Sequence, residues 1–388
     1  MCRLFFLLIV NNTYTYNINF SYNYIGEFMK KYKVCVYAIC KNEEQFVERW
    51  VKSMNEADAI YVMDTGSTDN TVQKLRDLGV NVMVEKISPW RFDVARNKSL
   101  DMVPLDTDIC VCTDLDEEFE IGWREKLEEN YSKNCRVNYT YNWHINENGI
   151  ADVTFLLNKI HPRIGYIWTH PVHEVLTPLN EEKFVNIESI ILNHYPDTTK
   201  SRGSYLELLE LSVKEDPEDD RNMHYLGREY MYYQRWEDCI DTLKKHLTLK
   251  KSTWNLERSA SMRYIARSYI NLNKEEDAKY WYNLSIEEAP NVREGYVELA
   301  ILYNKQGKWL ESINYLIKAL CIKEKPMVYM NEVFCWDNTI DDLMSINYYN
   351  LGLKDLAVYY VDKALEYNKD DERLLNNKKI FEGKLILE

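Results

Sequence analysis

The chain has 388 residues, 46% of them hydrophobic, and a formal net charge of −14 at pH 7. This length allows two domains, each with a substantial core. The acidic charge argues against nucleic acid and against a strongly anionic membrane as partners, so we expect neither a nucleic-acid surface nor stable membrane insertion.

The nine cysteines are odd in number and contain no Cys-x-x-Cys pair. This usage is typical of a reducing compartment, so we expect a cytoplasmic protein without structural disulfides or zinc. Cys110 and Cys112 stand two apart in an apolar run and are interpreted as small core residues.

Residues 1–28 differ from the rest of the chain. Leu4–Val10 is an apolar run of seven residues, too short to span a bilayer. An Asn- and Tyr-rich stretch follows it in place of a small-residue cleavage site. Because Met29 directly precedes the first predicted strand, we interpret 1–28 as a dispensable extension, disordered or a mis-assigned start.

Short apolar runs alternate with helical segments in the first third of the chain. Strands are predicted over 33–39, 59–63, 80–84 and 108–113. Helices are predicted from Asn42, as the cap, to about residue 55, and from Thr71 to about residue 78. This alternation predicts a parallel sheet with crossover helices.

Two aspartates, Asp114 and Asp116, follow the fourth predicted strand. Carboxylates at this spacing point to the same side and suit a Mg²⁺ or Mn²⁺ ion that a substrate's phosphates also bind. The loops 40–44 and 64–71 are expected on the same edge of the sheet, beyond the carboxyl ends of the strands, where open α/β sheets bind ligands. The sequence therefore predicts a pocket at this edge.

Four segments in chain order resemble the family 2 glycosyltransferases of GT-A fold: Ile39-Cys-Lys-Asn-Glu-Glu44, Asp64-Thr-Gly-Ser-Thr-Asp-Asn-Thr71, Phe92-Asp-Val-Ala-Arg-Asn-Lys98 and Asp114-Leu-Asp116. The resemblance covers about residues 33–200. It implies an α/β, Rossmann-like GT-A catalytic domain over 30–200 and a hexosyltransferase activity (EC 2.4) that uses a nucleotide sugar.

The resemblance also implies roles for single residues. Residues expected to contact the nucleotide are Asn42, Glu43, Asp64, Asp93, Arg96 and Asp114. Asp114 and Asp116 are expected to hold the diphosphate through Mn²⁺ or Mg²⁺. The family often has two consecutive aspartates where this chain has Asp64-Thr65, so the base contact and the choice of nucleotide stay open, with a UDP-sugar expected.

Inverting sugar transfer needs a group that takes the acceptor's proton. Further strands are predicted over 136–143, 151–157 and 166–168, and Glu174 after them is the expected base. The His173-Glu174 pair followed by a separate histidine resembles the peptide S-glycosyltransferases of glycocin (sublancin-type) biosynthesis. In GT-A enzymes more widely, a late histidine often completes the metal shell, and His194 is expected in that role.

Alternatives remain for these residues. Glu117 and Glu118 are other candidates for the base, and His173 is expected either to orient Glu174 or to touch the sugar. Each motif also has a structural interpretation of its own: a capped turn at 66–70, a solvated helical turn at Glu43 and surface charges near Arg96. One shared site explains their common order better than separate coincidences.

From about residue 216 the pattern becomes helical and repeats. Ala266, Tyr269, Ala278, Tyr282 and Ser285 recur 34 residues later as Ala300, Tyr303, Ser312, Leu316 and Ala319. An earlier copy includes Gly227 and Cys239, and a looser one includes Tyr348 and Ala357. The period resembles tetratricopeptide repeats, which implies an all-α solenoid over 203–388. Its concave face is expected to hold a peptide or partner. The alternative is a purely structural role, in which the array caps the catalytic domain.

We therefore expect an inverting, metal-dependent glycosyltransferase with a peptide or protein acceptor, modified at cysteine or serine. The expected sugar is glucose, N-acetylglucosamine or a near relative. A transferase of cell-envelope glycolipid or polysaccharide is the alternative within the same class. A repeat scaffold with an inactive transferase domain is the non-enzyme alternative. An oligomer is compatible with the sequence.

Overall fold

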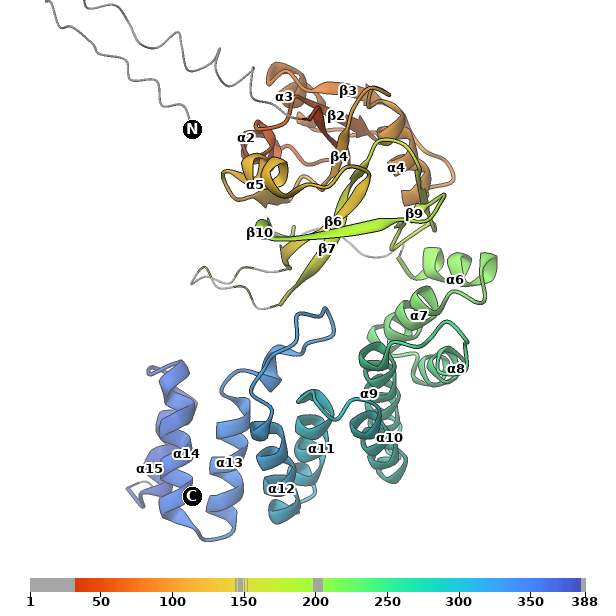
Figure 1. Ribbon diagram of the computed structural model, residues 1–388. Coiled ribbons are helices and arrows are strands. Elements are labelled where there is room, and N and C mark those ends of the chain that lie inside the picture. The colour runs from red at the N-terminus through yellow and green to blue at the C-terminus, as the bar shows by residue number, and fades with distance from the viewer. Residues whose placement is uncertain are drawn as a thin grey trace, which may run out of the picture.

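The computed structural model describes residues 32–143, 145, 149, 151, 153–197 and 205–384. An α/β domain is followed by an array of helices, and the two lie one above the other in Figure 1. The predicted extension over 1–28 lies outside the described residues. Of the helices in the described ranges, none combines the length and the apolar character that crossing a bilayer requires.

The first half of the sheet is parallel, as predicted. Its strands run in the order β3-β2-β1-β4, and their bounds are Asn81–Val84, Ala59–Asp64, Val34–Cys40 and Ile109–Cys112. The connecting helices are α2 (Val47–Met54), α3 (Thr71–Asp77) and α4 (Phe92–Asp101). Every residue of β1 is buried, because helices cover both faces of the sheet here. The carboxyl ends of β1, β2 and β4 therefore meet at one edge.

The predicted cap of α2 was wrong. Asn42 has a φ of 55° and lies four residues before Phe46, the N-cap of the helix. Asparagine tolerates this left-handed conformation better than most residues. The turn directs its side chain toward the loop after β2, where Asn42 Oδ1 accepts the Thr68 N–H at 2.7 Å.

The second half of the sheet is mixed, so the prediction of a parallel sheet does not extend to it. The full order is β3-β2-β1-β4-β7-β6-β10-β5. The added strands and helix are β5 (Glu117–Phe119), α5 (Trp123–Asn130), β6 (Cys135–Asn142), β7 (Thr154–Pro162) and β10 (Lys183–His194). Strand β7 is antiparallel to both of its neighbours, whereas β10 is parallel to β6 and antiparallel to β5.

A separate hairpin, β8 (Tyr166–Thr169) and β9 (Val175–Pro178), packs beside α4. Its connecting loop carries Glu174. On the other face of the sheet, Trp50 of α2 is fully buried and donates from Nε1 to Thr113 Oγ1 at 3.1 Å. This bond fixes the end of β4 directly before the two aspartates.

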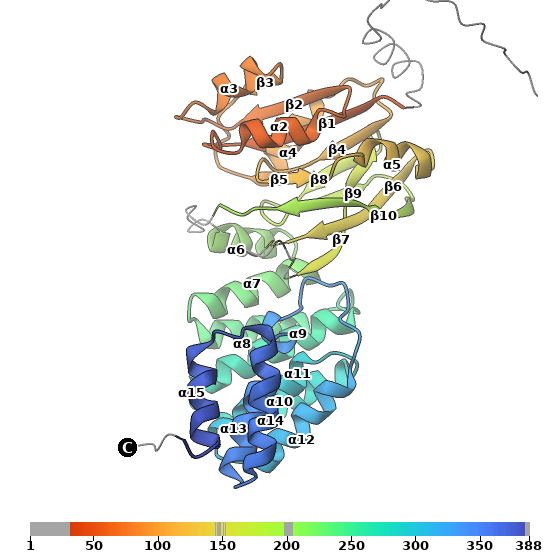
Figure 2. The same ribbon diagram turned by 90° about the vertical axis from the view of Figure 1, so that its left-hand side faces the viewer.

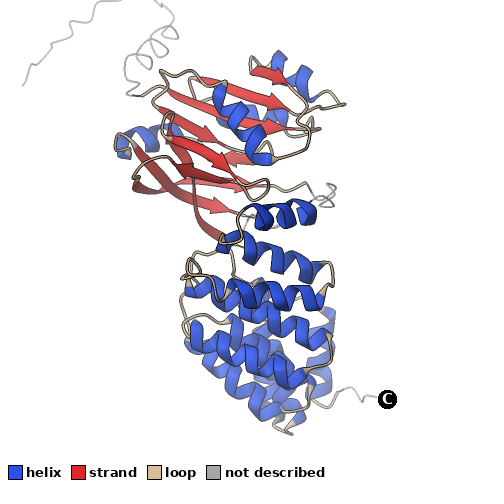
Figure 3. Cartoon of the chain, turned by 90° about the vertical axis from the view of Figure 1, so that its right-hand side faces the viewer, coloured by secondary structure: helices blue, strands red, loops and turns tan. Residues whose placement is uncertain are grey.

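The C-terminal half consists of helix pairs, as the repeat predicted. They are α7 (Asp220–Tyr232) with α8 (Trp236–His246), α9 (Asn255–Asn271) with α10 (Glu275–Glu288), α11 (Glu294–Lys305) with α12 (Trp309–Cys321), and α13 (Thr339–Asn350) with α14 (Lys354–Tyr367). Helix α6 (Tyr205–Glu215) precedes the first pair and α15 (Glu372–Phe381) follows the last. Figure 3 shows the pairs stacked below the sheet.

The small residues of the repeat lie where helices touch. Ala266, Ala300 and Ser312 are fully buried, and a Cβ at Gly227 would lie 2.3 Å from the Leu243 side chain. Residues 322–338, between α12 and α13, interrupt the repeat and contain the 3-10 turn η2 (Val333–Cys335). We call this segment the insert.

Candidate active site

The loops after β1 and β2 are bonded to each other. The Asn42 N–H donates to Ser67 Oγ at 2.8 Å and the Glu43 N–H donates to Thr71 Oγ1 at 2.8 Å. The Glu44 N–H also donates to Asp69 Oδ2 at 3.3 Å. The prediction that these two loops share one edge of the sheet is therefore confirmed.

Asp64 shapes the second loop. Its side chain is fully buried, and Oδ1 accepts the N–H groups of Gly66 at 3.0 Å and Ser67 at 2.9 Å. Gly66 has a φ of +109°, which a residue with a side chain rarely adopts. Contact of Asn42, Glu43 and Asp64 with a nucleotide stays a prediction.

Asp93 and Arg96 lie on α4 but have different partners. Asp93 pairs with Arg91, whose guanidinium also contacts Glu215 of α6 at 2.7 Å. Arg96, with only 3% of its side chain exposed, forms an ion pair with Asp114 and another with Glu174, where Nε lies 2.9 Å from Oε1. The structure thus joins the expected base to the Asp-x-Asp pair through one buried guanidinium.

Lys159 is a site residue that the sequence did not reveal. Its Nζ lies 3.4 Å from Asp114 Oδ2, because β7 pairs with β4. Burial alone would raise the pKa of Asp114, but the charges of Arg96 and Lys159 hold that pKa well below its ordinary value. Asp114 is therefore held as a carboxylate between two cations.

Glu117 supports the loop that carries the aspartates. It is 2% exposed, and it accepts the Asp114 N–H at 2.8 Å and the Tyr141 hydroxyl at 2.8 Å. Burial raises its pKa. Glu118, the other alternative base, pairs with Arg49 at 3.2 Å. These partners give both glutamates structural tasks, and the role of Glu174 as the base stays a prediction.

Asp116 and His194 are brought together from the ends of β4 and β10. His194 Nε2 lies 3.3 Å from Asp116 Oδ2, and Nδ1 lies 2.7 Å from the Trp143 carbonyl. A carbonyl can only accept, so Nδ1 carries the proton of this bond and Nε2 faces the carboxylate. A ligating histidine held at its other nitrogen by a carbonyl is the usual arrangement at metal sites.

The site offers few protein ligands for Mn²⁺ or Mg²⁺. Across the part of the chain that the structure describes, no three His, Cys, Asp or Glu side chains gather closely enough to hold an ion alone. Such ions are commonly bound by one or two protein ligands together with substrate phosphates. Asp116 and His194 therefore fit as ligands, whereas Asp114 is engaged with Arg96 and Lys159.

The hairpin that carries Glu174 is held to the domain core by a second residue of α4 and by β1. The Asn97 side chain exchanges two hydrogen bonds with the Trp168 backbone, each 2.8 Å long. Trp168 Nε1 donates to the Tyr37 hydroxyl at 2.9 Å, and that hydroxyl lies 2.8 Å from His161 Nε2. Asn97 belongs to the motif segment 92–98, but nothing in the sequence indicated that it supports this hairpin.

Stability is expected to depend on pH through buried histidines. Burial lowers the pKa of His161 to about 3, and burial also lowers the pKa of His224 to about 3. The pKa of a histidine in the unfolded chain is about 6.5. At a pH below this value, the unfolded chain binds a proton at each residue while the folded chain does not. The free energy of unfolding should therefore fall as the pH falls, by about 2 kcal/mol per histidine at pH 5.

Urea unfolding of the full chain at pH 7 and pH 5 measures this fall. His161→Gln carries an amide in place of the titrating ring, so the difference between its two unfolding free energies should be smaller. If the unfolding free energy fell by the same amount in the variant and in the unmodified chain, His161 would not be a source of the pH dependence.

Comparison with known proteins agrees with this geometry. Residues 35–175 match the model of the family described as glycosyl transferase family 2. The matched range contains all four motif segments and Glu174, and it ends before His194. No curated protein matches the chain.

Several solved structures match part of the chain. The MamA protein is 20% identical, with a TM-score of 0.34, over 47% of this chain and 86% of its own. PilF of Pseudomonas aeruginosa is 14% identical, with a TM-score of 0.36, over 46% of this chain and 72% of its own. YrrB, a TPR protein with an unusual peptide-binding site, is 14% identical, with a TM-score of 0.34, over 46% and 83%.

Residues 35–175 therefore match a glycosyltransferase family 2 domain, and they lie in a GT-A-like mixed sheet. That domain is followed by stacked helix pairs that have the 34-residue spacing of the sequence repeat. The family match supports a glycosyltransferase activity for the first domain.

Proposed function

We propose that the chain is an inverting, metal-dependent glycosyltransferase that moves a sugar from a UDP-sugar to a peptide or protein. The observation that carries this proposal is the ion-paired group Glu174, Arg96 and Asp114, which lies within the range that matches the family. It places a carboxylate next to the pair of aspartates expected at the donor diphosphate. The likeness to sublancin-type enzymes supports a peptide acceptor.

In this proposal Glu174 accepts the proton of the acceptor group as that group attacks the sugar. Arg96 holds the carboxylate in place, because its guanidinium is buried and also anchored at Asp114. Lys159, with 20% of its side chain exposed, places positive charge where the diphosphate departs. Mn²⁺ or Mg²⁺ at Asp116 and His194 would neutralise further charge on that leaving group.

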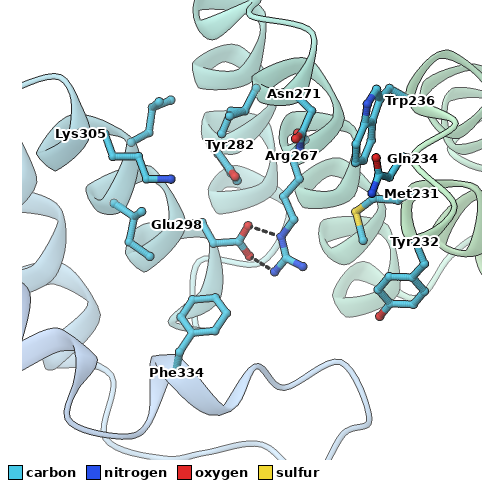
Figure 4. Close-up of a pocket in the computed structure, with 13 residues that line it drawn as sticks. Met231, Tyr232, Gln234, Trp236, Arg267, Asn271, Tyr282, Glu298, Lys305 and Phe334 are labelled. Carbon is cyan, nitrogen blue, oxygen red and sulfur yellow. Dashed lines mark hydrogen bonds and ion pairs between the residues drawn. The ribbon is translucent and has the colours of Figure 1, made fainter.

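A groove in the helical array supports a peptide acceptor. It has a volume of about 480 Å³ and is lined by α7 to α11 and the insert. Figure 4 shows Tyr232, Trp236 and Phe334 around the Arg267–Glu298 ion pair, in which Nε lies 2.7 Å from Oε2. Aromatic faces beside a fixed charge pair can bind apolar side chains and orient a peptide backbone.

Labelled donor tests the acceptor class. The full chain is incubated with radiolabelled UDP-glucose or UDP-N-acetylglucosamine, Mn²⁺ and an extract of its host cells. Label in the peptide and protein fraction supports the proposal, and label in the lipid or polysaccharide fraction supports the envelope alternative. Label in neither fraction, with no nucleotide released, supports the scaffold.

Groove variants test whether the array binds the acceptor. Phe334→Ala and Tyr232→Ala remove contact area, so each should raise the KM for the peptide about 5- to 30-fold. Tyr280→Ala is the matched control, because Tyr280 is 60% exposed on α10 and does not line the groove. An unchanged peptide KM in both groove variants would place the acceptor elsewhere.

A further inference from the structure

The loop that carries Glu174 is in contact with the helical array. His170 Nε2 lies 3.2 Å from Asp219 Oδ2, and the His173 ring stacks on Tyr225 with centroids 4.2 Å apart. Asp219 is the N-cap of α7, and Tyr225 lies on that helix. Figure 2 shows α6 and α7 directly below the sheet. The loop 170–174, which belongs to the first domain, therefore also contacts the helical array.

The two histidines have backbone conformations that need such support. The φ angle is 75° at His170 and 48° at His173, both in the left-handed region. For residues other than glycine this region costs about 1–2 kcal/mol, and it persists where surrounding contacts enforce it. Each of the two strained residues has a partner on α7. The array thus stabilises the conformation that directs Glu174 toward Arg96.

Tyr225 is itself fixed. It is 6% exposed, and the Arg228 guanidinium lies 4.7 Å from its ring centroid. The ring centroid of Tyr329, in the insert, lies 5.9 Å from the ring centroid of Tyr225. From the other domain, the Pro171 carbonyl accepts the Phe92 N–H at 3.0 Å. The loop consequently lies between α7 of the array and the start of α4.

We propose that Asp219 and Tyr225 are positioning residues for Glu174, so that the first helix pair of the array completes the catalytic site. This inference rests on the proposed function, since it assigns Glu174 as the base. It gives the array a task besides holding the acceptor. Donor turnover with water as the acceptor, which needs no peptide, should then also depend on α7.

Tyr225→Leu in the full chain tests the proposal. Losing the stacked ring should let the loop relax, and a misplaced base should lower kcat for donor turnover about 10- to 100-fold. The KM for the UDP-sugar should stay unchanged, because all the residues expected to contact the nucleotide lie outside this loop. Tyr225→Phe keeps the ring and should restore most of the rate. Tyr233→Leu, at an exposed position beyond the end of the same helix, is the control for nonspecific effects.

Asp219→Asn provides a second variant that keeps the helix cap. Asparagine caps helices as well as aspartate does, so the bond from the Asn222 N–H is retained while the charge facing His170 is removed. A fall in kcat at constant KM is expected. This variant keeps the proposal falsifiable if Tyr225→Leu does not fold.

Hydrogen exchange of the 169–175 amides in resting protein separates this proposal from the proposed function. Exchange should be faster in Tyr225→Leu than in Tyr225→Phe, even if no donor is turned over by any variant. Unchanged kcat and unchanged exchange in Tyr225→Leu and Asp219→Asn would overturn the proposal. A loss of rate explained wholly by a lower melting temperature would also overturn it. Absence of turnover in the unmodified chain would instead count against the proposed function.

Discussion

Glu174→Gln is expected to lower the rate of sugar transfer about 10²- to 10⁴-fold, the usual contribution of a general base. The amide cannot take the acceptor's proton. Its oxygen can still accept from Arg96 Nε, which lies 2.9 Å from Glu174 Oε1. The variant therefore changes the chemistry of the group while leaving its place in the hairpin intact. The measurement is kcat at saturating donor and acceptor.

Glu118→Gln is the matched control for this experiment. Glu118 follows the Asp-x-Asp pair and was an alternative base, but its carboxylate pairs with Arg49. Its removal should change the transfer rate little. Full transfer by Glu174→Gln, or a large loss in Glu118→Gln alone, would show that the base is assigned to the wrong residue.

Asp116→Ala is expected to remove metal-dependent donor turnover. Neutralising a leaving diphosphate contributes several kcal/mol, so the loss of kcat should be about 10²-fold or more. His194→Ala should lower turnover in the same direction, since the two side chains face each other at 3.3 Å. Turnover is measured with Mn²⁺ titrated against a fixed UDP-sugar concentration.

Asp114→Asn distinguishes the two aspartates. Asp114 is held by Arg96 and Lys159, so this change should disturb the position of Glu174 while the dependence on Mn²⁺ concentration is retained. Asp116→Ala should shift or abolish that dependence. If Asp116→Ala kept the Mn²⁺ response of the unmodified chain, the ion would be bound elsewhere.

The local sequence was sufficient to predict the strands in the parallel half of the sheet. Strands β1, β2 and β4 are continuous apolar runs, so their position and buried state could be predicted from composition alone. The start of α2 could not, because the left-handed turn at Asn42 depends on its bond to Thr68 across two loops. A cap and a left-handed turn have the same residue preference.

The site residues that could not be predicted from the sequence are those placed by pairing between strands that are far apart in the chain. Strand β10 mixes exposed and buried positions without regular alternation, so it lacked the pattern that identifies a strand. Lys159 reaches Asp114 only because β7 inserts antiparallel beside β4. The pairing of Asp116 with His194 was predictable only through the family resemblance.

In the helical array, too, local structure could be predicted and a contact between distant residues could not. Its helix pairs follow from the 34-residue spacing of small and aromatic residues. The contact between Tyr225 and His173 does not, since it depends on how two separately folded surfaces meet. Neither residue carries a local signal for the other.

Nucleotide release from a panel of UDP-, GDP- and dTDP-sugars, with Mn²⁺, with Mg²⁺ or with EDTA, tests the central claim most directly. Water can replace the acceptor, so slow release is expected without a peptide. The proposed function predicts release from a UDP-sugar that requires the divalent ion. No release from any donor, together with no thermal stabilisation by any nucleotide plus metal, would contradict it and favour the scaffold.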